Sequence, residues 1–185
     1  MRAMHIFAGL FCFAFFVSAS QSRAESVPTD PETLSAALGS FMDVIGGSTE
    51  TKSEPGQRVI SIVIDRNTVN GELSTLQRLG LINPDMNQTY FRAHENLLSF
   101  VVSLQASTMA VIAEYRAEKT DRSLVNVFFL VPDDYGQKQK QQAYSFTFDR
   151  ALFNRINWDN FDNSNLPKVA HEFQYSPWAR ANFMN

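Results

Sequence analysis

The sequence of 185 residues contains a single cysteine, Cys12. Cys12 lies in an N-terminal segment with the order of a secretory signal, so the exported chain is expected to contain no cysteine. Without cysteine, a chain forms no disulfide and has no thiol chemistry. Because small secreted eukaryotic domains more often depend on disulfides, this absence favours a bacterial periplasm or outer surface.

The signal itself consists of a basic residue, an apolar run and a small-residue end. Arg2 precedes an apolar run at residues 6–17, and small and polar residues follow it. That run is well short of the roughly 20 residues of a membrane-spanning helix. The small-residue rule allows cleavage after Ala19 or after Ala24, and we predict an exported protein, periplasmic or extracellular.

The mature chain, taken as residues 25–185, has few basic residues. The whole sequence has 16 basic and 19 acidic residues; removing Arg2 and Arg23 leaves 14 basic and 19 acidic, a net charge of −5. This balance argues against a nucleic-acid partner, which would need a basic patch, and against adhesion to anionic lipid. The length fits a single globular domain.

Motifs for catalysis and metal binding are also lacking. The chain has neither the G-x-S-x-G turn of a serine hydrolase nor a glycine-rich phosphate loop. His94 and Glu95 are adjacent, so they lack the spacing of a zinc-protease helix. With two histidines and no cysteine after the signal, a zinc site would need carboxylates from distant segments. We therefore predict no metal and no cofactor.

Apolar periodicity predicts the helices. Asp30 and Pro31 mark the start of a helix, an apolar stripe from Leu34 to Ile45 forms its buried face, and the Gly46-Gly47 pair ends it. A short helix is predicted around residues 73–79, and another at residues 150–158.

The stretch at residues 96–113 carries no charge and can be interpreted in three ways. A third of it is polar, which argues against a membrane span. Its apolar residues recur every three or four positions as far as Tyr115, which favours a long buried helix whose charged end projects into water. A strand at residues 97–104 remains an alternative.

Four segments are predicted to be strands. Residues 58–65 and 123–132 are almost continuously apolar, as expected of central strands covered on both faces, whereas residues 143–149 and 168–176 alternate apolar and polar side chains. Residues 48–57 and 135–142 have the composition of loops. Together these elements predict an α/β or α+β sandwich with a mixed sheet of about four strands packed by helices.

The C-terminal segment carries the candidate site residues. His171, Phe173 and Tyr175 share one face of the last predicted strand, and Trp178 follows it. Docking of this face onto the core explains the aromatic residues in structural terms. The same three aromatic side chains are also our candidates for contact with a partner, since aromatic residues dominate interface energies.

Three functions follow as hypotheses. The first is a non-enzymatic accessory protein that binds another envelope or secreted protein through an open sheet edge. The second is a small hydrolase in which His171 is the acid-base group and Asp149 or Asp133 orients it. The third is a ligand-binding module with a pocket around His171.

Overall fold

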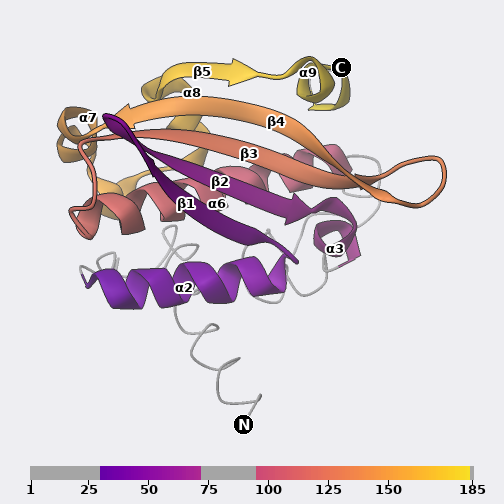
Figure 1. Ribbon diagram of the computed structural model, residues 1–185, viewed down its shortest axis with the longest axis horizontal. Coiled ribbons are helices and arrows are strands. Elements are labelled where there is room, and N and C mark those ends of the chain that lie inside the picture. The colour runs from indigo at the N-terminus through magenta and orange to yellow at the C-terminus, as the bar shows by residue number, and fades with distance from the viewer. Residues whose placement is uncertain (1–29, 72–94, 184–185) are drawn as a thin grey trace, which may run out of the picture.

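The computed structural model describes residues 30–71 and 95–183, which form an open five-stranded sheet packed by helices (Figure 1). The strand order is β1-β2-β3-β4-β5, in which β2 and β3 are parallel and the other neighbours antiparallel. The strands are β1 (Ser48–Glu54), β2 (Gln57–Asp65), β3 (Arg122–Pro132), β4 (Lys138–Asp149) and β5 (His171–Tyr175). The mixed α/β class is therefore confirmed, with five strands rather than about four.

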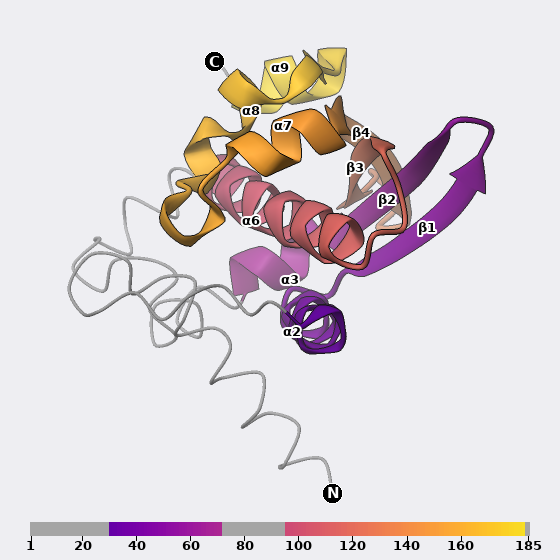
Figure 2. The ribbon, with the colours of Figure 1, turned by 90° about the vertical axis from the view of Figure 1, so that its left-hand side faces the viewer.

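The helices of the described chain gather on one face of this sheet (Figure 2). They are α2 (Pro31–Val44), α3 (Arg66–Gly71), α6 (Glu95–Arg116), α7 (Arg150–Arg155), α8 (Leu166–Val169) and α9 (Pro177–Phe183), with short 3₁₀ turns at Trp158–Asn160 and Asn163–Asn165. Helix α2 begins as the sequence predicts, because the Asp30 carboxylate accepts a hydrogen bond from the Thr33 N–H at 2.7 Å. The predicted signal, the predicted helix at 73–79 and His94 lie outside the described residues.

Strand β1 corrects the prediction of a loop at residues 48–57. All seven of its residues are polar and exposed, so its own sequence has no apolar pattern. It is a strand because it pairs with β2 without interruption, from Ser48 opposite Val63 to Glu54 opposite Gln57. Pro55 and Gly56 form the two-residue turn, and the positive φ of Gly56 (78°) is one that a turn of this kind requires.

Strands β2 and β3 are less deeply covered than their apolar sequences suggest. On the helix side Ile60, Ile62 and Ile64 of β2 are buried, as are Val125, Val127 and Phe129 of β3. On the other side Val59, Val63, Leu124, Phe128 and Leu130 are only half-buried. The expectation of coverage on both faces is therefore wrong, since the described helices cover one face.

Helix α6 is the long buried helix of the three alternatives. Residues Leu97–Arg116 are long and apolar enough to cross a membrane, but 78% of the most apolar window is buried inside the protein. Its charged end does not simply project into water as expected. Glu114 is buried, and its Oε1 accepts a hydrogen bond from Arg58 Nε of β2 at 3.0 Å.

Serine residues on α6 receive a large side chain from the sheet. Ser103 and Ser107 are buried one turn apart, and the hydroxyl of Tyr144 on β4 lies 3.0 Å from each serine Oγ. The small serine side chains leave room for the tyrosine ring, and their hydroxyls satisfy its polar end. Burial raises the pKa of Tyr144, so this phenol stays protonated at physiological pH.

Strand β4 begins earlier than the sequence predicts. The segment expected to be a loop at residues 135–142 is mostly strand, because Lys138 to Gln142 pair with β3. The true connection is five residues long, Asp133 to Gln137, and it places Tyr135 in solvent at 91% exposure. As with β1, pairing with an apolar neighbour makes a strand of a polar sequence.

Candidate functional site

The candidate site lies where the end of β4 meets the start of β5. Strand β5 pairs with β4 so that Thr147 faces His171 and Ser145 faces Gln174. This pairing brings His171 Nε2 to 3.2 Å from Asp149 Oδ2. Two of the three residues that the sequence offered as acid-base candidates are therefore in contact.

The His171–Asp149 pair is open to water. The side chains are 52% and 42% exposed, respectively. Asp149 also has a structural task, because its Oδ1 accepts a hydrogen bond from the Leu152 N–H at 2.7 Å and thereby caps the first turn of α7. Its carboxylate would be needed to start this helix even if His171 had no function.

Three neighbours complete what we call the rim cluster: Arg122, Thr147, Asp149, His171 and Glu172. Thr147 Oγ1 lies 3.3 Å from Glu172 Oε2 and 3.4 Å from the carbonyl oxygen of His171. Arg122 Nη2 lies 3.9 Å from the same Glu172 oxygen. Glu172 has a positive φ of 52°, and the register of β4 against β5 shifts beside it. This irregular backbone turns the end of β5 into a polar corner.

Asp133 is not part of this corner. It lies in the β3–β4 connection, and the paired length of the hairpin from Pro132 to Arg122 separates it from Asp149 by about 33 Å. Asp133 organises its own turn, accepting hydrogen bonds from the N–H groups of Gln137 at 2.8 Å and Tyr135 at 3.0 Å. Hydrogen bonds from Gln137, Gln139 and Tyr135 lower the pKa of Asp133, so it stays ionised.

The aromatic residues of the tail point back onto the core. Phe173 stacks on Tyr144 and Phe146, with ring centroids 5.0 and 5.6 Å apart. The ring centroid of Tyr175 lies 5.9 Å from that of Phe100 on α6, and the ring centroid of Trp178 lies 6.0 Å from that of Phe129 on β3. Phe173, Tyr175 and Trp178 all remain half-buried; the first two lie on edge strand β5, and Trp178 lies on the helix α9 that follows it.

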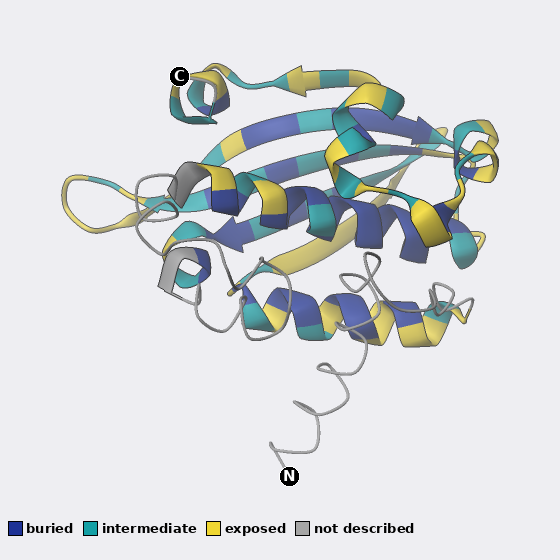
Figure 3. Ribbon diagram, turned by 180° about the vertical axis from the view of Figure 1, so that it is seen from behind, coloured by how far each residue is buried: buried dark blue, intermediate teal, exposed yellow. Residues whose placement is uncertain are grey.

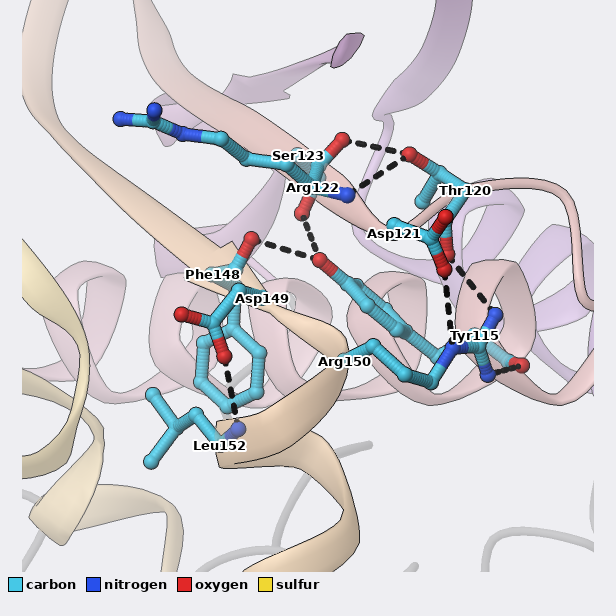
Figure 4. A network of polar contacts seen from close by, with 9 residues as sticks. All are labelled: Tyr115, Thr120, Asp121, Arg122, Ser123, Phe148, Asp149, Arg150 and Leu152. Carbon is cyan, nitrogen blue, oxygen red and sulfur yellow. Dashed lines mark hydrogen bonds and ion pairs between the residues drawn. The ribbon is translucent and has the colours of Figure 1, made fainter. Parts of the chain in front are cut away.

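A second network fixes the base of the rim cluster (Figure 4). Arg150 follows Asp149 and donates hydrogen bonds to the carbonyl oxygens of Tyr115 at 2.6 Å and Thr120 at 2.8 Å. These carbonyls belong to the end of α6 and the segment after it, where a cation is favoured. The Tyr115 hydroxyl in turn donates to the carbonyl of Phe148 at 2.6 Å, and burial raises the pKa of Tyr115. Two hydrogen bonds thus connect the end of β4 to the end of α6, one from the Tyr115 hydroxyl and one from the Arg150 guanidinium.

One ion pair that was not predicted from the sequence lies at the C-terminal end of β2. Asp65 is buried, and Lys138 Nζ lies 2.5 Å from its Oδ2. Burial raises the pKa of Asp65, but hydrogen bonds from Lys138 and the Asn67 N–H outweigh it and lower the pKa overall. The only sequence signal for this site is the position of Asp65, a carboxylate at the end of a strand and directly before a helix.

The described residues hold no group of three or more histidine, cysteine, aspartate or glutamate side chains placed to bind a metal ion. The rim cluster places the imidazole of His171 beside a carboxylate and can present hydrogen-bonding groups to a partner. Comparison with protein-family models, curated protein sequences and solved structures finds no match for this chain.

Proposed function

We propose that this protein is an exported, non-enzymatic accessory protein that binds another envelope protein at the free edge of β5. One observation carries the proposal: β5 is the last strand in the order, and among the described residues no strand pairs with its outer side. An unpaired edge that is held rigid can accept an extended segment of a partner as an additional strand.

The outer side of β5 offers backbone groups for such pairing. Ser176 N–H donates to the Ala143 carbonyl at 2.9 Å, so the backbone of Ser176 is turned toward β4. Gln174, two residues earlier, lies opposite Ser145 in the same register. Because alternate residues of an antiparallel strand direct their backbone groups to opposite sides, those of Tyr175 point outward.

The aromatic residues support this function in two ways. Their stacking on the core fixes β5 before a partner arrives, which reduces the entropy lost on binding. Because Phe173 and Tyr175 on β5 and Trp178 on the following helix are only half-buried, they can offer apolar surface to a partner, and such residues commonly dominate binding energy.

A photoreactive amino acid placed at Gln174 tests the proposal in the producing cell. We expect one discrete adduct with another envelope protein, because Gln174 is exposed on β5. The matched control is Asn154, which is equally exposed on α7 away from the edge. No adduct at Gln174, or the same adduct at both positions, would reject the β5 edge as the binding surface.

The contact between His171 and Asp149 favours a second candidate, a small hydrolase. Histidine next to a carboxylate can act as a general base, and the 3.2 Å separation is suitable. The test is turnover of small ester and phosphoester substrates by the wild type, the His171→Gln variant and the Asp149→Asn variant. Activity lost in both variants would establish this candidate, whereas activity absent from the wild type or unchanged in the variants would count against it.

A further inference from the structure

Strand β1, at the opposite edge of the sheet, has a charge pattern that is complementary to itself. The strand is exposed along its whole length (Figure 3). Among the described residues, β2 is the only strand that pairs with it. Glu50 and Lys52 form an ion pair at 3.1 Å on the face of the sheet away from the helices. We propose that β1 pairs antiparallel with β1 of a second copy of this chain, about a two-fold axis at Thr51.

The turn between β1 and β2 determines which backbone groups are free. Glu54 and Gln57 flank a two-residue turn and exchange hydrogen bonds, so Lys52 and Glu50 also direct their backbone groups toward β2. The intervening residues Thr49, Thr51 and Ser53 therefore direct their N–H and C=O groups away from the sheet. A second strand must pair with these three.

Two copies of β1 can pair antiparallel near the middle of the strand in three registers. The charges of Glu50 and Lys52 determine which register is favoured. With Thr51 opposite Thr51, Glu50 faces Lys52 of the second copy and Lys52 faces Glu50. A shift of two residues in one direction places Glu50 opposite Glu50. A shift in the other direction places Lys52 opposite Lys52. Opposite charges across a strand pair stabilise it and like charges destabilise it.

The same pairing joins suitable side chains on the other face of the strand. Thr51 meets Thr51, and Thr49 meets Ser53 of the second copy, all of them small residues that fit a pleated surface. Charged side chains usually protect an edge from unselective pairing. Here the charges of Glu50 and Lys52 disfavour pairing with most other strands. They are complementary to the same segment of a second copy that runs antiparallel. The pairing is isologous, so it closes at two copies.

Cysteine substitution reads the register directly, in the full chain with Cys12→Ser. A hydrogen-bonded antiparallel pair places its Cα atoms about 5.5 Å apart, within the range of a disulfide. Thr51→Cys alone should therefore give a disulfide-linked dimer under mild oxidation. Thr49→Cys alone and Ser53→Cys alone should not, because each lies about 13 Å from its own copy. A mixture of the last two should cross-link.

Charge reversal tests the interaction that selects this register. Sedimentation should show that Glu50→Lys alone, or Lys52→Glu alone, weakens association about tenfold or more, because each creates only like-charge pairs. Mixing these two variants should restore association, as should combining both changes in one chain. Asp134→Lys is the matched control for Glu50→Lys, since it makes the same charge change at an exposed position in the β3–β4 connection.

The outcomes separate clearly. Cross-linking at Thr51 together with rescue by mixing supports the proposal. A chain that is monomeric at its highest soluble concentration overturns it. So does a dimer that neither cross-links at Thr51 nor responds to charge reversal, because such a dimer uses another surface.

Discussion

The two edges of the sheet are held in place by different physical forces. Edge strand β5 is five residues long and irregular, and its aromatic side chains stack on buried rings of β4. Edge strand β1 is seven residues long and regular, with every side chain exposed. On that side of the sheet the neighbouring strand β2 is anchored by the buried Ile60, Ile62 and Ile64 and carries two partly buried ion pairs, Arg58–Glu114 and Asp65–Lys138.

This difference shows that an edge strand can be fixed by burial of its own side chains or mainly by backbone pairing with its neighbour. Apolar contacts change little with pH or salt, whereas ion pairs respond to both. We therefore expect perturbations near β5 to act mainly through lost packing. Perturbations of the exposed β1 and of the two ion pairs on β2 should act through charge.

The largest effect should come from Phe173→Ala. Removing a ring that stacks on Tyr144 and Phe146 should lower the free energy of unfolding by about 3 kcal/mol, at the lower end of the range for buried rings because Phe173 is half-buried. The matched control is Thr51→Ala on β1, expected to cost about 0.5 kcal/mol. Urea unfolding measures both. Equal losses would show that the two edges are held alike.

The next largest effect should come from Arg58→Met. This change removes the partner of the buried Glu114 carboxylate and should cost about 2 kcal/mol, since an uncompensated charge is left away from water. The double variant Arg58→Met with Glu114→Leu should recover most of that loss. If the double variant is as unstable as the single one, the stem of Arg58 matters more than its charge.

Protonation of Asp65, at the end of β2, should lower the stability of the fold in acid. Its folded pKa lies below the ordinary value of 3.8, so its contribution to stability is present above about pH 4 and is lost as the pH falls through the folded pKa. Asp65→Asn should therefore flatten the fall in stability below pH 4 without changing the profile near neutrality. Urea midpoints at pH 7, 4 and 3 measure this. An unchanged slope would exclude Asp65 as a source of acid sensitivity.

The smallest effect should come from His171→Gln. Half-exposed polar contacts contribute little, so we expect the free energy of unfolding to change by no more than about 0.5 kcal/mol at pH 7. Thermal melting of the variant and the wild type side by side is sufficient. A loss well above this value would make His171 a structural residue and would weaken the case for either functional role.

Much of the helical architecture could be predicted from the sequence, because local signals specify it. Asp30 and Pro31 begin α2 as expected, and the unbroken apolar periodicity of α6 marks it as a core helix. Strand β1 could not be predicted in this way. Its polar sequence is a strand only because β2 pairs with it, and pairing between segments leaves no local pattern.

The candidate site shows the same limit. His171 and Asp149 meet because β5 pairs with the end of β4, which is a property of the sheet rather than of either segment. Asp133 was an equally reasonable partner by residue type, and only the length of the β3–β4 hairpin separates it from His171. The burial of Glu114 likewise depends on Arg58, which is 56 positions away along the chain.

The parallel pairing of β2 with β3 has a consequence for the time course of folding. Each residue of β2 meets a residue 65 positions later, as Arg58 meets Ser123, whereas β1–β2 and β3–β4 are joined by short turns. Local hairpins form within microseconds, but closing a long loop carries an entropic cost that must be met before its contacts stabilise it. We therefore expect the β1–β2 and β3–β4 hairpins to form early. Their pairing along β2 and β3, after α6 has formed between them, should limit the folding rate.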